Sequence, residues 1–234
     1  MPREKHNTAS LSEFLIYLAE MKDSEGDRLP SLSDLSQQLG VSIASLREQM
    51  EVARSMGLVE VRPKTGIRRL PYTFRPAVSS SLKYAVTVDP QLFDAFADLR
   101  KHIEACYWHE ATCLLKQDDI AKLQYLIQRA QAKLHSDPIQ LPNDEHRELH
   151  LTIYCRLNNP FVMGILESYW ELYEAIGLAV YADLAYHESV WQYHQKMVQA
   201  LASGDVDLGY QALVEHMNLI NQRNKPSTKN LSFE

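Results

Sequence analysis

The sequence predicts a mainly α protein, with an N-terminal winged helix-turn-helix domain and a C-terminal all-α helical bundle of about six helices. Residues 28–70 contain two short runs of helical spacing, separated by a Gly-Val break and followed by two short alternating runs. Residues 71–88 are rich in proline and serine and show no helical period. From residue 89 onward, helical patterns follow one another without a convincing strand.

These patterns divide the 234 residues into expected domains. We expect the winged helix-turn-helix domain at 1–70, an interdomain linker at 71–88, the helical domain at 89–224 and a disordered polar tail at 225–234. No apolar run approaches the roughly eighteen residues that a membrane helix needs. Three cysteines without C-x-x-C spacing indicate neither a disulfide framework nor a thiolate metal site. We therefore expect a cytoplasmic protein with no membrane partner.

The first domain begins with an expected helix over residues 10–21, whose apolar side chains share one face. Ser31 and Ser42 stand at the heads of the next two helices, where their oxygens can accept from free backbone N–H groups. Gly57 suits the left-handed cap that ends the second of these helices. Residues 58–70 alternate with period two around a Pro-Lys-Thr-Gly turn, which predicts a two-stranded wing.

The net charge of −6 argues against a protein that coats nucleic acid by bulk attraction. The distribution is uneven, because residues 42–70 hold six Lys/Arg and three Asp/Glu, whereas residues 71–234 hold fourteen and twenty. The basic excess lies on the second helix of the helix-turn-helix and on the wing. Since it is modest, dimerisation would be needed for tight DNA binding.

The second half of the chain predicts six amphipathic helices joined by short links. The expected ranges are 90–112, 118–135 opening at Asp118, 143–157, 160–182, 188–202, and 205–223 opening at Asp205 after the stop at Gly204.

Histidines are the informative residues of this half. His146 and His150 are four residues apart and share a helix face, while His194 and His216 lie on two helices joined by a short turn. Their inward faces could converge, and neutral imidazoles suit a divalent transition metal, zinc first and nickel as the alternative. The competing interpretation is that each is an ordinary polar residue. We accept that interpretation for the remaining histidines of the bundle, which are His102, His109, His135 and His187.

The patterns do not predict an enzyme. His146 and His150 nearly match the metalloprotease H-E-x-x-H motif, but Glu148 lies about 200° round the helix from each of them and faces away. The chain contains no Glu-x-x-His pair, no phosphate-cradling glycine loop and no nucleophile elbow.

A distinctive set of residues spans the helix-turn-helix and the wing. It consists of Leu29-Pro30-Ser31, Leu35, Leu39-Gly40-Val41-Ser42, Leu46-Arg47-Glu48, Gly57-Leu58-Val59-Glu60-Val61-Arg62-Pro63 and Gly66. In these residues the chain resembles the GntR-type winged-helix regulators. The resemblance implies a double-stranded DNA operator, contacted through Ser31, Ser33, Ser42, Ile43, Ala44, Ser45, Arg47, Arg62, Lys64, Thr65 and Gly66, with Arg68 and Arg69 near phosphate. Family members usually carry Arg where Ser33 and Ile43 stand, so only Arg47 is expected to read bases as in the family.

A second set of residues lies in the bundle: Leu99-Arg100 with Glu104, Leu149-His150, Asn159-Pro160, His194, Ala200, Gly204-Asp205, Ala212 and His216. Here the chain resembles the FCD ligand-binding domain of FadR-type GntR regulators. In that family an Asp one turn before the first His joins three histidines to bind a metal, which helps to hold a small carboxylate effector. His146 replaces the Asp, so whether it ligates and which metal is bound stay open.

The resemblance also implies that Arg100 clamps the effector carboxylate through a bidentate fork. The alternative is an Arg that snorkels or pairs with Glu104 one turn away. The aromatic residues Tyr169, Trp170, Tyr173, Tyr181 and Tyr186 are expected to form helix-packing core or dimer surface, with only a minority lining the pocket.

Together these expectations describe a bacterial, metabolite-responsive transcriptional regulator, a repressor in the commoner family arrangement. It would act as a homodimer that binds an imperfect palindrome with one reading helix in each major groove. Two alternatives stay open: a regulator for which the metal itself is the signal, and a metal-dependent hydrolase fused to a recognition module.

Overall fold

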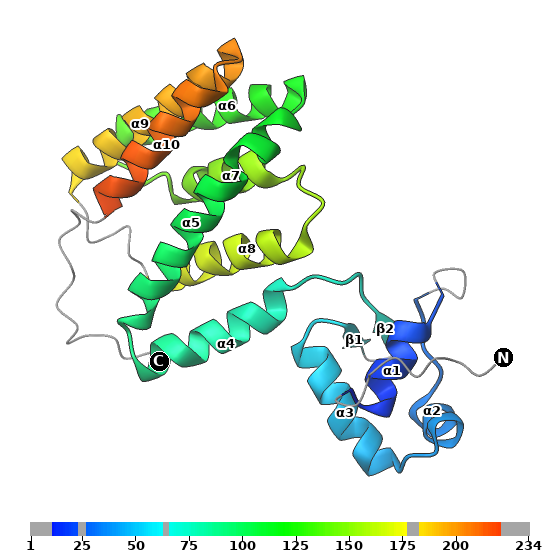
Figure 1. Ribbon diagram of the computed structural model, residues 1–234. Helices are drawn as coiled ribbons and strands as arrows, with labels where there is room; N and C mark the ends of the chain where they lie inside the picture. Colours follow the sequence, from blue (N-terminus) through cyan, green and yellow to red (C-terminus); the bar gives the residue numbers. More distant parts are fainter. Residues whose placement is uncertain (1–10, 23–26, 63–65, 177–182, 221–234) are drawn as a thin grey trace. The chain divides into compact units, whose positions relative to one another are not determined.

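The structure is a computed structural model that describes residues 11–22, 27–62, 66–176 and 183–220. Contacts within the chain divide it into two compact units, residues 1–80 (the first unit) and residues 81–234 (the second unit). The described residues form helices and one β-hairpin (Figure 1). This confirms the predicted fold class of a winged helix-turn-helix followed by a helical bundle.

The first unit contains three short helices and an antiparallel hairpin. Its elements are α1 (Glu13–Glu20), α2 (Leu32–Leu39), α3 (Ile43–Ser55), β1 (Val59–Arg62) and β2 (Gly66–Arg69). The register of the hairpin places Val59 opposite Arg69 and Arg62 opposite Gly66. An isolated bridge between Arg28 and Arg68 adds the chain before α2 to the outer edge of the wing.

The predicted caps set the geometry of the helix-turn-helix. The Ser31 hydroxyl accepts from the N–H of Asp34 at 3.3 Å, and the Ser42 hydroxyl accepts from the N–H of Ser45 at 3.2 Å. Gly57 follows α3 with a φ of 72°, and a Cβ added there would lie 2.5 Å from Cγ of Pro76. A side chain at Gly57 would therefore be excluded both by the backbone conformation and by the proline ring.

The core of the first unit joins both parts of the motif. Phe14, Leu35 and Leu46 are completely buried, one from each helix, and Val59 and Ile67 of the wing pack against them. Burying side chains of this size stabilises the fold by about 1.5–3 kcal/mol each. The wing is thus held to the helices by hydrophobic packing.

The expectation of an irregular linker over residues 71–88 is wrong for most of that range, because α4 (Arg75–Val88) is a helix. Pro76 lies in its first turn, where no backbone N–H is needed. Leu82 and Val86 are buried against aromatic residues of α5 (Leu92–Cys113) and α8 (Pro160–Ala175), including Phe93 and Trp170. Packing on partners distant in sequence therefore stabilises a helix that the local pattern does not reveal. The predicted domain boundaries themselves stay a prediction.

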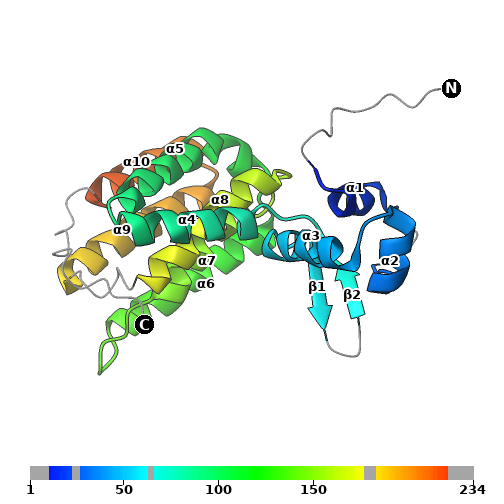
Figure 2. The ribbon, with the colours of Figure 1, turned by 90° about the horizontal axis from the view of Figure 1, so that it is seen from below.

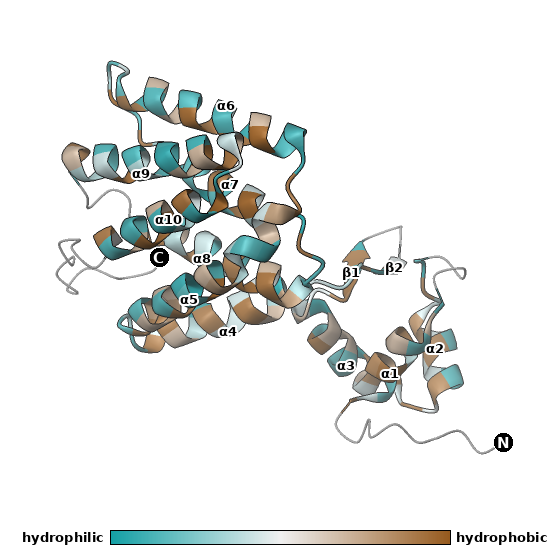
Figure 3. Cartoon of the chain, turned by 45° about the horizontal axis from the view of Figure 1, so that its top comes forward, coloured by the Kyte–Doolittle hydropathy of each residue, from teal (hydrophilic) through white to brown (hydrophobic). Residues whose placement is uncertain are grey.

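The second unit contains the six remaining helices. They are α5 (Leu92–Cys113), α6 (Gln117–Leu134), α7 (Asn143–Tyr154), α8 (Pro160–Ala175), α9 (Leu184–Ser203) and α10 (Val206–Ile220). α7 packs against α5, α6 and α8, while α9 packs against α6 and α10 (Figures 1 and 2). Hydrophobic and hydrophilic residues alternate along these helices (Figure 3), as expected for helices with one buried face.

Three of the helix starts predicted in the second unit differ in the structure, and the first is that of α5, which begins at Leu92 and not at residue 90. The Asp119 carboxylate accepts from the N–H of Lys116 at 2.9 Å, so α6 opens before Asp118. The Asp183 carboxylate accepts from the N–H of Tyr186 at 2.8 Å, and this cap starts α9 earlier than the apolar pattern suggests. The tail predicted to be disordered at 225–234 lies outside the described residues.

Candidate metal centre and nucleic-acid interface

Four histidines meet inside the second unit. α7 presents His146 and His150 one turn apart, while α9 and α10 contribute His194 and His216. Their potential ligand nitrogens all lie within 4.8 Å of one another. The other four histidines of the bundle lie outside this cluster, as predicted.

The turn between α9 and α10 brings two of these residues together. Gly204 has a φ of 80°, which ends α9 with the expected left-handed cap. The Asp205 carboxylate accepts from the N–H of Leu208 at 2.9 Å and starts the return helix. The rings of His194 and His216 consequently face each other with their centroids 4.4 Å apart.

The spacing of the nitrogens suits a single transition-metal ion. His150 Nε2 lies 3.1 Å from His194 Nε2. Two nitrogens bound tetrahedrally to zinc at about 2.0–2.1 Å lie roughly 3.3 Å apart. The cluster could therefore hold a metal with little movement of these two rings.

The environment of the cluster favours neutral imidazoles. Burial lowers the pKa of His146, His194 and His216 well below the ordinary value, and neighbouring histidines lower it further. The described part of the chain offers no hydrogen-bond partner to His146 Nε2, to His194 Nδ1 or to either nitrogen of His216. Buried nitrogens without partners, on rings that stay uncharged, are the donor set that a divalent metal requires.

Glu104 of α5 supplies a buried negative charge beside the cluster. Its side chain is 0% exposed, and its Oε1 lies 3.2 Å from His150 Nδ1. Burial alone would raise the pKa of this carboxyl, but Arg100 and His150 together lower it to about 2. Nη2 of Arg100 also lies 3.3 Å from His150 Nδ1. In the His150 tautomer that donates from Nδ1 toward the ionised Glu104, Nε2 is free to bind a metal.

Arg100 lies in the same buried region as the histidines. Its side chain is 1% exposed, and Nη2 donates to Glu104 Oε2 at 2.8 Å. Burial lowers the pKa of the guanidinium, but Glu104 and Tyr169 outweigh this effect and raise it. Arg100 therefore stays charged and does not snorkel to solvent. The alternative of a pair with Glu104 is observed, next to the residues predicted to bind a metal.

Aromatic rings surround the cluster. The centroid of His146 lies 4.6 Å from that of Trp170 and 6.0 Å from that of Trp191, and His194 lies 4.8 Å from Trp191. The sequence interpretation placed Trp170 among aromatic residues of helix-packing core or dimer surface, of which a minority would line the pocket, and it did not consider Trp191. Because Trp191 precedes His194 by three residues on one helix, helical spacing could have identified it. Tyr181 lies outside the described residues.

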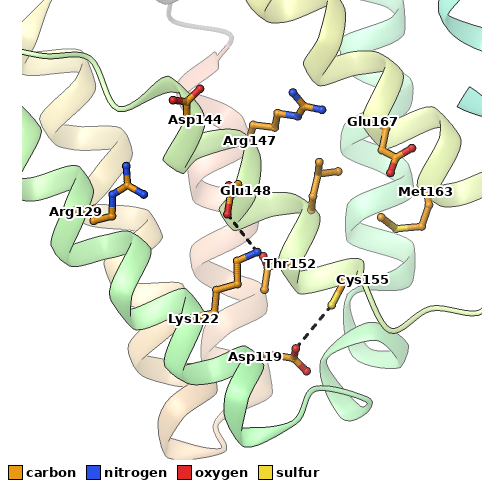
Figure 4. A pocket seen from close by; sticks show the side chains of 11 residues that line it. Asp119, Lys122, Arg129, Asp144, Arg147, Glu148, Thr152, Cys155, Met163 and Glu167 are labelled. Atoms are coloured by element: carbon orange, nitrogen blue, oxygen red, sulfur yellow. Dashed lines mark hydrogen bonds and ion pairs between the residues drawn. The ribbon is translucent and has the colours of Figure 1, made fainter.

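A separate cavity of about 540 Å³ opens between α6, α7 and α8 (Figure 4). Its walls carry charges of both signs, and Lys122 forms an ion pair with Glu148 across it at 3.2 Å. Glu148 is exposed on α7, away from the face that carries His146 and His150. Arg129, Arg147 and Asp119 of its walls pair with Glu145, Glu174 and Arg156, which do not line the cavity. With both signs of charge on its walls and most of them engaged in ion pairs, the cavity does not resemble a site for one charged ligand.

In the first unit, the residues predicted to contact DNA cluster at the start of α2, at the start of α3 and on the wing. Exposed positions are Ser31, Ser33, Ser42, Ile43, Ala44, Arg47, Arg62 and Gly66, while Ser45 is half-buried. Two of the hydroxyls also serve as helix caps, and Arg62 pairs with Glu60 at 2.9 Å. Lys64 and Thr65 lie outside the described residues. The start of α3 is thus an accessible edge with one cation, Arg47, in its first two turns.

Among the described residues, none of the helices combines the length and the apolar character needed to cross a membrane.

Comparison with known proteins gives a consistent result. Residues 95–219 match the FCD domain family, which is more than half of the chain. The Uxu operon regulator of Haemophilus influenzae is 23% identical over 83% of this chain and 72% of its own length. The Uxu operon transcriptional regulator of Escherichia coli is 24% identical over 85% of this chain and 78% of its own length.

A solved structure supports the fold. Streptococcus agalactiae GntR superposes with a TM-score of 0.62 at 16% identity, covering 91% of this chain and 97% of that protein. The match extends over both units, so it agrees with a helix-turn-helix with wing followed by a helical bundle. From these matches and the observed fold, the chain belongs to the GntR family of DNA-binding transcriptional regulators with a C-terminal FCD domain.

Proposed function

We propose that this regulator senses a small carboxylate metabolite through a metal-containing pocket in its second unit and represses transcription as a homodimer. The observation that carries the proposal is the convergence of four imidazoles, three of them buried and that of His146 half-buried, beside a buried arginine. His146, His150, His194 and His216 would hold a divalent transition metal, zinc first and nickel as the alternative. The metal would supply a positive charge, acting as a Lewis acid toward a carboxylate oxygen.

The protein residues would provide the rest of the pocket. Arg100 brings a permanent positive charge to the site, and Glu104 both holds Arg100 and orients His150. Because Glu104 neutralises the charge of Arg100, this pair would bind a carboxylate through the N–H donors of Arg100, while the metal would supply the net positive charge. His146 stands where the family resemblance places an Asp, so the site would carry one negative charge fewer than usual and attract an anionic ligand more strongly.

The first unit would read the operator. Arg47 at the start of α3 would contact a base edge in the major groove, with Ser42, Ala44 and Ser45 beside it. Arg62 and Gly66 of the wing would lie near phosphate. Two copies would bind the two halves of a palindrome, and effector binding would shift the population between DNA-competent and incompetent dimers. Relatives named for regulation of an operon or of fatty acid metabolism are consistent with control of a metabolic operon.

The hydrolase interpretation is withdrawn, because a GntR-family regulator is not an enzyme.

The metal-responsive alternative makes a different prediction from the proposed function. DNA duplexes selected from a random pool with the zinc-loaded full chain would serve as the operator. Metal and a panel of carboxylates are then titrated separately while DNA affinity is measured by fluorescence anisotropy. We expect a carboxylate to lower the affinity of the zinc-loaded protein. A response to metal alone, unchanged by every carboxylate, would favour metal as the signal.

A further inference from the structure

The indole N–H group of Trp170 is a buried hydrogen-bond donor in the second unit. The side chain is 1% exposed, and the described residues provide no acceptor for its Nε1–H group. Indole nitrogen can only donate a hydrogen bond. Since buried polar groups in folded proteins nearly always find a partner, this donor points to an acceptor that arrives with a ligand.

The position of Trp170 connects the two parts of the proposed pocket. Its ring lies 4.6 Å from the His146 ring and 5.1 Å from the His150 ring, measured between centroids. The Cζ atom of Arg100 lies 5.0 Å from the centroid of the same indole. A small ligand held between the metal ligands and Arg100 would therefore lie next to Trp170.

Arg100 cannot offer its whole donor set to such a ligand. Its Nη2 donates to Glu104 at 2.8 Å and lies 3.3 Å from His150 Nδ1. Its guanidinium also forms a side-chain hydrogen bond with Tyr169, with Cζ 4.5 Å from the ring centroid. Nε is buried, and within the described part of the chain it has no acceptor. As packed, Arg100 has a spare donor at Nε but lacks the free pair of nitrogens that a bidentate fork needs.

We propose that Trp170 is a further effector-binding residue, which shares the carboxylate with Arg100. Nε–H of Arg100 donates to one oxygen of the carboxylate and Nε1–H of Trp170 donates to the other. This inference rests on the proposed function, because it adds a contact to the same pocket. It also defines the ligand class. Two N–H groups can donate to the two oxygens of a carboxylate. They exclude the matching carboxamide, because its NH₂ group is itself a donor and would face one of them.

The other tryptophans of the second unit provide matched comparisons. Trp191 also packs against the cluster, 4.8 Å from the His194 ring, but its nitrogen is not among the buried atoms without a partner in the described residues. Trp108 donates its N–H to the carbonyl of Val206 at 3.0 Å. A Phe in place of Trp191 therefore changes aromatic packing near the cluster without removing an unused buried donor.

The test compares Trp170→Phe with Trp191→Phe in the zinc-loaded full chain. Acetate, lactate, pyruvate, succinate and citrate are titrated by calorimetry, each beside its carboxamide where one exists. A hydrogen bond to a charged group corresponds to a factor of about 10–100 in affinity. We expect Trp170→Phe to lose that factor for the carboxylate that the wild type binds and to keep its zinc. Trp191→Phe should stay close to the wild type, and the carboxamide should bind weakly to all three proteins.

A second measurement does not depend on any variant folding well. In ¹⁵N-tryptophan-labelled wild type, the indole N–H resonance of Trp170 should shift downfield when the carboxylate saturates the protein. Wild-type affinity in a zinc-loaded Trp170→Phe variant, or an unmoved indole resonance, would overturn the role of Trp170 and leave the metal and carboxylate site standing. Zinc-loaded wild type that binds no carboxylate at all would overturn both this inference and the proposed function.

Discussion

The two units of this chain place their predicted functional side chains in opposite environments. In the first unit, Arg47 and Ile43 are exposed on α3, while the core beneath them is made of other residues. In the second unit, Arg100, His194 and His216 are themselves part of the buried interior. An exposed side chain can be replaced with little effect on its neighbours. Replacing a buried polar group also leaves its hydrogen-bond partners unpaired, so the effect extends to them.

Removing one imidazole from the buried cluster should have the largest effect. In His216→Ala the cluster loses a ligand whose two nitrogens lack any partner among the described residues. We expect metal binding to fall from stoichiometric to undetectable after dialysis, measured by plasma mass spectrometry. His102→Ala, an exposed position on α5, should keep its metal. Equal metal content in His216→Ala and the wild type would remove His216 from the ligand set.

Glu104→Gln tests whether the coupling extends beyond the ligands. The amide keeps the shape of the side chain but removes the negative charge that lies 3.2 Å from His150 Nδ1. Loss of such an outer partner weakens metal binding by about 10–100-fold, which competition with a fluorescent chelator would measure. The control is Glu110→Gln, an exposed position on the same helix. An unchanged metal affinity would limit Glu104 to holding Arg100.

The exposed site should respond differently to the loss of its charge. Arg47→Ala should reduce the preference for operator over random DNA by about 1–3 kcal/mol, while the free energy of unfolding changes by less than about 0.5 kcal/mol. Arg54→Ala offers a control on the same helix, because Arg54 pairs with Glu51 at 2.6 Å near the other end. Anisotropy titrations at two salt concentrations would measure both. Equal losses on operator and random DNA would mean that Arg47 contacts phosphate only.

The smallest effect is expected from replacing Ser42, to which we assign two roles in the first unit. Ser42 is a predicted DNA contact, but its hydroxyl also caps α3. Ser42→Ala should destabilise α3 by about 1 kcal/mol and Ser42→Asp should not, as measured by amide hydrogen exchange of the full chain. If both variants exchange like the wild type, the cap contributes nothing measurable.

The sequence identifies those parts of the fold that depend on local signals. Ser31, Ser42, Gly57 and Gly204 mark helix ends that the structure confirms, because a cap involves only residues within one turn. The helix α4 could not be predicted in this way. Its first turn contains a proline and its middle contains three serines, and its stability comes from burying Leu82 and Val86 on distant helices.

The same distinction applies to the candidate metal centre. Spacing on α7 and the short turn between α9 and α10 indicate that four histidines could converge, the resemblance to the FCD domain favours it, and the structure brings them together. The contacts of Glu104 with His150 and of Trp170 with Arg100 join residues far apart in the chain. Helical periodicity in the sequence does not indicate such contacts, since they depend on how α5, α7 and α8 pack together.

The distribution of the histidines over α7, α9 and α10 has a mechanical consequence. One ion bound by these residues would act as a cross-link between α7 and the helices α9 and α10, and one of its ligands, His216, lies on α10, the last described helix. Local opening of α10 would then require the ion to dissociate first. In the metal-free protein, α10 would open locally at a lower free energy than the centre of the bundle. With the ion bound, its free energy of local opening would rise toward that of the centre.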